Sequence, residues 1–377
     1  MENGKSKIKS ILVGVDASRS NVKQKTGTEY YSQEIIKHLV ENKEVDFRLY
    51  SKTPLGFLKK EQNIDFKVMP FPKLWSQIRL SLELLVNKPD VLFEPAHTIP
   101  VIHGQKVVTT LHDVGFRHFP ELYTPLERFY HNWSMAFAVR HATKIITISE
   151  STKKDLVKFY SADPKKIEII YHGYDRQKFY PKKAGQKAPD EILKLGEYIY
   201  FIGRLEAKKN IVSLVKAFGV LRKNHSELKT KLVLAGRPGY LYEDIKTEIG
   251  KLDKNVQKDV IEPGYIPDEI MADYLRFAKV FAFPSKFEGF GMPLVEAMAC
   301  NVPIVASNTT SIPEITGSAA LLHDVEDVDQ IAEYLYIALK DENIRKRLIG
   351  DGTKRLPMFD WDKAASKTLD VIKSALD

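Results

Sequence analysis

Short blocks of β-branched and aliphatic residues alternate with longer helical segments along most of the chain, and this alternation limits the fold more than any other feature. In the first half the apolar blocks lie at residues 8–16, 45–50, 64–69, 90–93, 106–111, 144–148 and 167–171. Helical periodicity follows several of these blocks, at 28–41, 73–86 and 123–141. Strands separated by helices predict βαβ units, and therefore a parallel sheet covered by helices.

The alternation stops at residues 180–192 and then restarts. This segment is rich in proline and lysine and has no periodicity, so we interpret it as an interdomain linker. A chain of 377 residues is long enough for two domains of about 150–200 residues each. We therefore predict an α/β protein with two tandem doubly wound Rossmann-like domains, 1–180 and 181–358, and a final amphipathic helix within 359–377. Six further strands are predicted at 198–203, 231–235, 259–262, 280–283, 303–307 and 319–322.

Charge is unevenly distributed along the chain. Residues 1–180 hold 28 lysines and arginines against 20 aspartates and glutamates, whereas residues 181–377 hold 29 of each. Two interpretations of the basic half stay open: it binds a phosphorylated acceptor or an anionic membrane surface, or its lysines only keep the protein soluble. Nucleic acid is disfavoured as a partner, because the chain has no dense basic run with interleaved aromatic residues.

Other bulk features predict a cytoplasmic protein. The N-terminus lacks the apolar core and small-residue cleavage site of a secretory signal, and no apolar run approaches the ~18–20 residues that span a bilayer. The single cysteine, Cys300, excludes an internal disulfide framework and fits a reducing compartment. We expect a soluble protein in the cytoplasm; if the basic half binds membrane, the contact would be peripheral, at the inner membrane face.

Ligands of open α/β sheets bind beyond the carboxyl ends of the strands, so the loops that leave the strands are the places to search. Two such domains facing each other would form a cleft between these loops. In the segment YIYFIGRLEAKKN, a predicted strand ends at Gly203, and Arg204 and Lys209 follow before a helix begins near residue 210. A planar guanidinium, a mobile ammonium and a helix N-terminus together suit a diphosphate. An ordinary basic surface beside a helix start is the alternative interpretation.

The segment KFEGFGMPLVEAMAC, at 286–300, places two glutamates around a glycine turn. Glu288, Gly289, Phe290 and Gly291 lie in the loop after a predicted strand, and Glu296 lies one turn into the next helix. Backbone N–H groups of the glycine turn can bind a ligand oxygen, and carboxylates can accept hydrogen bonds from sugar or ribose hydroxyls. A solvated loop acid and a partner of the helix dipole are the alternatives for the two glutamates.

These motifs together resemble the family 4 glycosyltransferases, retaining enzymes of the GT-B fold that use nucleotide-sugar donors. The resemblance rests on Gly-Arg-x4-Lys at 203–209 and on Glu-Gly-x-Gly with a second glutamate eight residues later, and it covers nearly all of 195–370. It implies that Arg204, Lys209 and the amides of Gly289–Gly291 bind the donor diphosphate, Glu288 the sugar and Glu296 the ribose. It also implies that the last helix crosses back onto the N-terminal domain. The nucleobase would lie against Gly264, Tyr265 and Ile266.

The N-terminal half resembles the same family more loosely. TTLHDVGFRHFP, at 109–120, resembles the loop whose histidine lies beside the donor sugar, which implies catalytic roles for His112 and Asp113 together with Glu288. Many members carry a Gly-Gly pair after the first strand, whereas this chain has only Gly27 in KTGTEYYS. A helix N-terminus after Gly27 would still bind an anion. Four other histidines are interpreted as structural: His97, His103, His118 and His172.

The resemblance implies a metal-independent retaining hexosyltransferase that needs no cofactor beyond its nucleotide-sugar donor. We expect it to transfer mannose from GDP-mannose to a glycan or polyprenyl-linked acceptor in surface polysaccharide biosynthesis. Transfer from UDP-glucose or UDP-GlcNAc, a sugar-nucleotide epimerase and a non-catalytic nucleotide-binding scaffold are the alternatives. A dehydrogenase is disfavoured because VGVDASRS, after the first strand, lacks G-x-G-x-x-G. No Asp-x-Asp pair is placed as a metal site.

Overall fold

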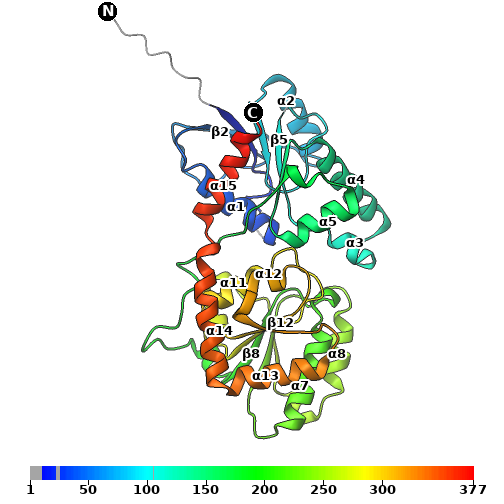
Figure 1. Ribbon diagram of the computed structural model, residues 1–377, viewed down its shortest axis with the longest axis vertical. Helices are drawn as coiled ribbons and strands as arrows, with labels where there is room; N and C mark the ends of the chain where they lie inside the picture. The colour runs from blue at the N-terminus through cyan, green and yellow to red at the C-terminus, as the bar shows by residue number, and fades with distance from the viewer. Residues whose placement is uncertain (1–10, 23–25, 105) are drawn as a thin grey trace, which may run out of the picture. The chain divides into compact units, whose positions relative to one another are not determined.

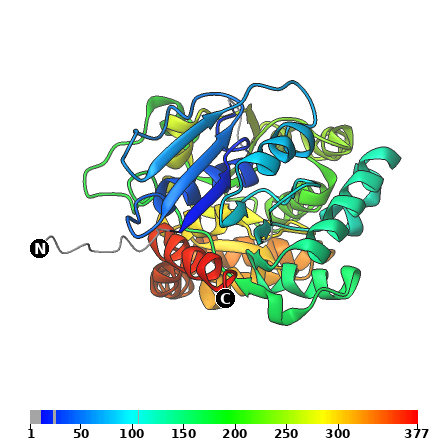
Figure 2. The same ribbon diagram turned by 90° about the horizontal axis from the view of Figure 1, so that it is seen from above.

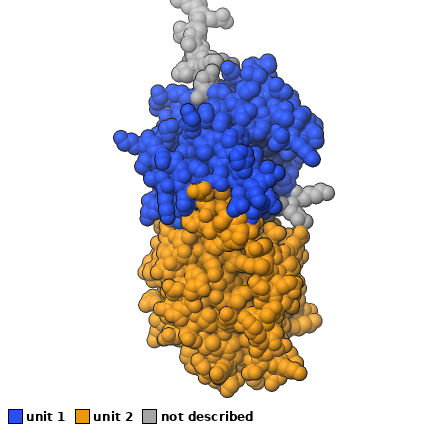
Figure 3. Space-filling model, turned by 90° about the vertical axis from the view of Figure 1, so that its right-hand side faces the viewer, with its two compact units in different colours: residues 1–114, 123–173, 360–377 blue, residues 115–122, 174–359 orange. Residues whose placement is uncertain are grey.

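The computed structural model describes residues 11–22, 26–104 and 106–377, which form two compact units (Figure 3). The first unit comprises residues 1–114, 123–173 and 360–377, and the second comprises residues 115–122 and 174–359. The division therefore falls after Gly173, whereas the sequence places it after residue 180. The predicted linker, 180–192, lies inside the second unit and ends in a one-turn helix, α6 (Asp190–Leu193).

The first unit is built on a seven-stranded sheet in which every neighbouring pair is parallel (Figures 1 and 2). The strand order is β3-β2-β1-β4-β5-β6-β7, so the direction of winding reverses between β1 and β4. In the register, Val13 lies opposite Phe47 on one side and Val91 on the other. The strands are β1 (Leu12–Asp16), β2 (Asp46–Ser51), β3 (Ile64–Val68), β4 (Val91–Glu94), β5 (Val107–Leu111), β6 (Lys144–Thr147) and β7 (Ile167–Ile169).

Helices cover this sheet, and most of them begin at a residue that can cap a helix. Thr124 and Ser149 accept hydrogen bonds from the first turns of two helices, which satisfies amides that would otherwise lack a partner. The predicted helix at 73–86 is a π-helical turn, η1 (Ser76–Leu80), that continues as α2 (Ser81–Val86). The other helical segments are α1 (Gly27–Leu39), α4 (Pro125–His141), α5 (Glu150–Tyr160), η3 (Pro164–Lys166) and α15 (Trp361–Ser374).

The C-terminal helix α15 belongs to the core of the first unit, although nearly 190 residues separate it from the previous segment of that unit. It packs along α1, and Trp361, Leu369 and Ile372 are buried with the α1 side chain of Ile35 (Figure 1). A Cβ on Gly173 would lie 2.3 Å from the backbone nitrogen of Trp361, so only glycine allows the chain to approach the start of α15 this closely.

The second unit is built on a six-stranded parallel sheet of order β10-β9-β8-β11-β12-β13, whose winding reverses between β8 and β11. Its strands are β8 (Tyr198–Ile202), β9 (Lys231–Ala235), β10 (Val260–Gly264), β11 (Val280–Phe283), β12 (Ile304–Ser307) and β13 (Ala320–His323). Its longer helices are α7 (Ile211–Asn224), α8 (Tyr242–Gly250), α10 (Asp268–Arg276), α11 (Met292–Ala299), α13 (Val328–Lys340) and α14 (Glu342–Arg355). Shorter turns include α3 (Gly115–His118), η2 (Pro120–Leu122), η4 (Ala207–Lys209), α9 (Lys254–Gln257), α12 (Ile312–Thr316), η5 (Gly317–Ala319) and η6 (Leu356–Met358).

The predicted fold class, two tandem doubly wound parallel sheets, is confirmed. All thirteen predicted strands are present, with most bounds shifted by only one or two residues, although residues 8–10 of the first lie outside the described part of the chain. Within the described residues, no helix combines the length and the apolar character needed to cross a bilayer.

Candidate active site

In the second unit, the residues singled out by sequence gather at the carboxyl end of the sheet. β9, β8, β11 and β12 are consecutive neighbours and all parallel, so the loops that leave them emerge at one edge. The reversal between β8 and β11 lies in the middle of this set. An open α/β sheet binds its ligands at such a reversal, because the loops on either side of it diverge and leave a crevice.

Two glycines let the loops after β8 and β9 pack backbone against backbone. Gly203 and Gly236 have φ of 152° and 147°, and a Cβ on Gly236 would lie 1.7 Å from the carbonyl oxygen of Gly203. Beyond the two strands, Leu205 and Pro238 form an isolated parallel bridge. The predicted glycine turn after β8 is therefore present. The position of this turn is fixed by contact with LAGRPG, which comprises the end of β9 and the loop that follows it.

Lys209 and Glu288 form an ion pair across the reversal point. Lys209 Nζ donates to Glu288 Oε1 at 2.6 Å, and the two side chains are only 15% and 13% exposed. A backbone hydrogen bond from Lys286 N–H to the Lys208 carbonyl, at 2.8 Å, fixes the two loops to each other. Two predicted donor-binding residues from different strands are thus in direct contact. A partly desolvated pair of this kind holds each charge in position.

Arg204 lies beside this pair but is held less tightly. Its side chain is 68% exposed, and Nε lies 3.7 Å from a carboxylate oxygen of Glu206. Glu206 also receives Lys208 Nζ at 3.6 Å, so it connects both cations of the loop. An exposed guanidinium in the same loop as a fixed ammonium is suited to bind the oxygens of a diphosphate.

The glycine turn after β11 is held in place by the loop after β12. Thr310 Oγ1 accepts a hydrogen bond from Glu288 N–H at 3.1 Å, and Ser311 Oγ lies 2.9 Å from the Glu288 carbonyl oxygen and 3.0 Å from that of Phe290. Gly291 has φ of 96° and caps α11, where Pro293 lies in the first turn as predicted. Sequence reasoning missed Thr310 and Ser311. Their position in NTTS, after a strand adjacent to β11, could have indicated them.

Glu296 lies in the middle of α11 and is half-buried. Burial raises the pKa of Glu296 to about 7. Attraction from Lys178 lowers this pKa in part, and repulsion from Asp268 raises it further. Lys178 and Asp268 themselves lie 3.4 Å apart. A carboxyl group with a pKa near 7 can either accept or donate a hydrogen bond to a hydroxyl group at neutral pH.

The proposed nucleobase contacts follow β10, at the edge of the sheet. Gly264 has φ of 75°, and its carbonyl accepts a hydrogen bond from Gly236 N–H at 2.8 Å. Tyr265 is 59% exposed, and the guanidinium of Arg237 lies 4.7 Å from its ring centroid. Ile266 is buried. Arg237 was not singled out by sequence reasoning, although it lies within LAGRPG.

In the first unit, His112 directly follows β5 and is buried among aromatic rings. Its Nε2 lies 2.8 Å from the Pro95 carbonyl oxygen, which can only accept, so Nε2 carries the proton and Nδ1 the lone pair. Burial lowers the pKa of His112, and the Pro95 carbonyl and Asp113 counteract this only in part. The ring packs edge-on to Tyr31, with centroids 4.8 Å apart. The side chain is therefore a fixed, neutral imidazole.

Asp113 and Gly27 also lie at this end of the first sheet. Asp113 is exposed in the loop directly after His112. Gly27 is the first residue of α1, and a Cβ there would meet no atom within 4 Å, so the turn is open. The N-terminus of α1 already carries a capping box, in which Glu29 accepts a hydrogen bond from Thr26 N–H at 3.0 Å. An anion at Gly27 would therefore meet a nearby carboxylate.

A carboxyl pair lies where the winding of the first sheet reverses, and sequence reasoning missed it. Asp16 ends β1 and Glu94 ends β4, and both are buried. Burial, followed by the charge and hydrogen bond of Asp16, raises the pKa of Glu94 well above its usual value. Asp16 also accepts a hydrogen bond from Ser76 Oγ at 3.0 Å. Burial beside Asp16 therefore favours the protonated form of Glu94.

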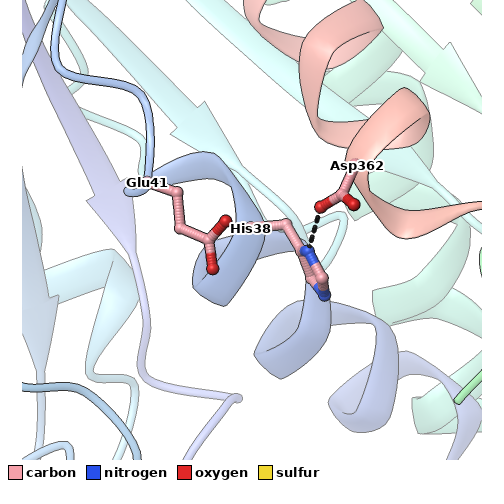
Figure 4. Close-up of side chains that lie close together, drawn as sticks. All are labelled: His38, Glu41 and Asp362. Atoms are coloured by element: carbon pink, nitrogen blue, oxygen red, sulfur yellow. Dashed lines mark hydrogen bonds and ion pairs between the residues drawn. The ribbon is translucent and has the colours of Figure 1, made fainter. Parts of the chain in front are cut away.

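One group of side chains in the described part of the chain has the spacing of a metal site. His38, Glu41 and Asp362 offer ligand atoms within 4.8 Å of one another (Figure 4). His38 Nδ1 lies 2.6 Å from Asp362 Oδ1, and this contact connects α1 to α15 on the surface of the first unit. The group is largely exposed and none of its members was predicted to act in catalysis, so we interpret it as part of the helix packing.

Comparison with known proteins identifies the relatives of both units. Residues 186–355 match the model described as "Glycosyl transferases group 1", and residues 25–178 match "Glycosyltransferase Family 4". The chain is 29% identical to O-antigen chain mannosyltransferase B of Escherichia coli over 71% of this chain and 70% of that protein. It is 23% identical to O-antigen chain mannosyltransferase RfbU of Salmonella typhimurium over 87% and 96%. The structure of Anabaena HepE in complex with UDP and glucose superposes with a TM-score of 0.70 at 16% identity, over 97% and 100% of the two chains.

Proposed function

Because the chain belongs to the group 1, family 4 glycosyltransferases and has their GT-B architecture, we propose that it transfers mannose from GDP-mannose, with retention, to a growing surface glycan. The observation that carries the proposal is the Lys209–Glu288 pair at the sheet reversal. It holds a cation for the donor phosphates and a carboxylate for the sugar hydroxyls in one small site. The choice of mannose follows the two O-antigen mannosyltransferases among the relatives.

The reaction breaks the bond between the anomeric carbon and the phosphate oxygen and forms a bond from that carbon to an acceptor oxygen. Positive charge develops on the sugar and negative charge on the diphosphate. Lys209, Arg204 and the amides of Gly289–Gly291 stabilise the departing diphosphate, the preorganised electrostatic contribution that is usually the largest in catalysis. The proton of the acceptor hydroxyl passes to the leaving phosphate on the same face of the sugar. This front-side course preserves the anomeric configuration.

The remaining predicted residues orient the donor. Glu288 accepts hydrogen bonds from hydroxyls of the sugar, and Glu296 binds the ribose. The lone pair on His112 Nδ1 accepts a hydrogen bond from the sugar, since Nε2 is already bonded to Pro95. Asp113 is proposed to favour the positive charge that develops on the sugar, and the N-terminus of α1 at Gly27 is proposed to bind the phosphates. The base stacks near Gly264, Tyr265 and Ile266, with Arg237 on the tyrosine ring.

We propose that the reaction needs neither a divalent metal nor a cofactor. The charge of the diphosphate is met by Arg204 and Lys209, both within one loop. Turnover that survives exhaustive EDTA treatment would support this assignment. A loss of turnover that Mg²⁺ or Mn²⁺ restores would contradict it.

The acceptor is proposed to be a glycan or a polyprenyl-linked glycan, and the enzyme to work in the cytoplasm with peripheral contact at the inner membrane face. The O-antigen relatives favour an acceptor of this class. The basic N-terminal half suits both a phosphorylated acceptor and an anionic membrane.

A thermal-shift screen with GDP, UDP, ADP and their sugars tests the donor. GDP-mannose should raise the melting temperature most, since a ligand that binds only the folded state stabilises it by mass action. Arg204→Ala should abolish transfer, and Glu296→Ala should weaken donor binding. Wild-type rates in both variants would refute the site assignment.

UDP-glucose or UDP-GlcNAc is the second candidate donor, favoured by the UDP and glucose present in the structure of HepE. Preferential stabilisation by UDP-sugars would select it. An epimerase is less favoured, because the Lys209–Glu288 pair provides no separate acid and base for elimination. An epimerase would form an isomeric nucleotide sugar without an acceptor, which chromatography of the nucleotide sugars would detect.

A further inference from the structure

Helix α4 carries an apolar stripe that faces solvent. Leu126 and Phe129 are 77% and 71% exposed, and Tyr130 and Trp133 are 37% and 39% exposed. These positions follow the i, i+3, i+4, i+7 spacing of one helix face. The opposite face packs inward through Met135 and Ala138. The helix is therefore apolar on two sides, although only one side faces the core of the unit.

Stacked rings extend the stripe along α4. Tyr130 and Trp133 have centroids 6.0 Å apart, and Trp133 stacks on Phe137 at 5.5 Å. Phe137 in turn lies 6.3 Å from His103, in the loop after β4. This loop also presents Val101 and Ile102, which are 45% and 39% exposed.

The same loop is fixed to α2, which carries exposed leucines of its own. Ile102 N–H donates to Ser81 Oγ at 3.3 Å, and Val101 N–H donates to Gln77 Oε1 at 2.9 Å. Leu82 and Leu85 on α2 are 53% and 52% exposed. The six residues Leu126, Phe129, Tyr130, Trp133, Val101 and Ile102, here named the apolar surface, thus belong to a larger exposed region of one unit. Exposed regions of this kind mark interaction sites.

Positive charge accompanies this region. Residues 123–166, from the residues before α4 to the end of η3, hold eight lysines and arginines against four aspartates and glutamates. α5 packs beside α4, where Tyr160 donates to Asn132 at 3.1 Å, and it exposes Lys154 and Lys158. A partner of this region should therefore be apolar and carry negative charge.

We propose that the apolar surface docks on an anionic lipid bilayer, with the α4 side chains inserted at the headgroup level and the α5 lysines over the lipid phosphates. Tryptophan and tyrosine favour that depth, because their rings are amphipathic. Lysines beside an inserted face add attraction to anionic lipids. A second copy of the chain fits less well, because a symmetric contact through this surface would bring like-charged lysine clusters together. The proposal rests on the peripheral membrane contact proposed above, but not on the proposed transfer reaction.

Trp133 provides a direct probe, because the other two tryptophans, Trp75 and Trp361, are only 2% and 4% exposed. Vesicles of phosphatidylcholine with phosphatidylglycerol should shift the tryptophan emission to shorter wavelength, and brominated lipid should quench it. Sedimentation with the same vesicles measures binding. Neither measurement needs a donor or an acceptor, so its failure is distinct from failure of the proposed transfer reaction. An unchanged emission together with no sedimentation would overturn the proposal.

Leu126→Ser/Phe129→Ser should reduce vesicle binding at least about ten-fold, because binding scales with the apolar area that is inserted. The matched control is Leu193→Ser/Met358→Ser, which removes two exposed apolar side chains of the second unit and should bind as wild type does. Lys154→Gln/Lys158→Gln should weaken binding to anionic vesicles several-fold. Equal loss in the control, equal binding to pure phosphatidylcholine, or a dimer that Leu126→Ser/Phe129→Ser dissociates in place of vesicle binding would each overturn the proposal.

Discussion

The two sheets share one architecture, but the places where their winding reverses differ in electrostatic character. In the second unit the crevice holds partly exposed charges, Lys209, Glu288 and Arg204. In the first unit burial favours neutral forms: the pKa of His112 is lowered and that of Glu94 is raised. A charged ligand such as a diphosphate therefore suits the second unit. The first unit is suited to hydrogen bonding with uncharged hydroxyls.

Lys209→Ala should have the largest effect on the electrostatic difference between the two units. It removes the fixed cation and leaves the carboxylate of Glu288 only 13% exposed without its partner. We expect kcat/KM to fall about 1,000-fold, the scale of a lost transition-state charge contact. Lys208→Ala is the matched control, because Lys208 pairs with Glu206 at the adjacent position. Steady-state kinetics that show similar losses in both variants would mean that only the overall charge of the loop matters.

His112→Ala should produce the next largest effect, a fall in kcat/KM of about 100-fold. Two further variants separate its nitrogens: His112→Asn keeps an acceptor near the position of Nδ1, whereas His112→Gln keeps a donor near Nε2 for the Pro95 carbonyl. If Nδ1 binds the sugar, His112→Asn should retain more activity than His112→Gln. Rates in the opposite order, with both variants folded by circular dichroism, would assign His112 a structural role.

The sequence predicted those features of the fold and the site that depend on the spacing of residues within one segment. The strand order along the chain, the glycine turn before α11 and the position of Glu296 one turn into that helix all follow from spacing within one segment. Contacts between segments could not be predicted in the same way. Asp16 and Glu94 lie 78 residues apart and meet only because β1 and β4 are neighbours in the sheet. The support of Glu288 by Thr310 and Ser311 likewise depends on β11 pairing with β12.

Ser311→Ala tests whether that support matters for the charged crevice. The substitution removes the hydroxyl that lies 2.9 and 3.0 Å from the carbonyl oxygens of Glu288 and Phe290. Loss of one buried hydrogen bond costs about 1 kcal/mol, so we expect a fall in kcat of about five-fold, with a melting temperature lowered by only a few degrees. Ser213→Ala, which removes a buried hydroxyl on α7, serves as the control for stability. Equal kcat for Ser311→Ala and wild type would show that the turn holds its shape without the Ser311 hydroxyl.

Glu296→Gln should have the smallest effect on turnover. Its effects on stability and on donor binding should depend on pH, which tests whether a carboxylate is needed in the second unit. The carboxyl pKa is about 7 in the folded chain against an ordinary value of 4.5, so the unfolded chain loses this proton first as pH rises. The free energy of unfolding of the wild type should therefore fall between pH 4.5 and 7 and then level off. Above pH 7 the neutral amide avoids this cost, and Glu296→Gln should be more stable than wild type by about 1–3 kcal/mol.

The same variant should bind the donor several-fold more weakly at pH 8, since it loses a charged acceptor for the ribose hydroxyls. Urea denaturation at pH 5 and pH 8, with donor titration at pH 8, measures both changes. Reduced stability at pH 8 would mean that Glu296 has a charged partner in the fold, and unchanged donor affinity would remove it from the ribose site.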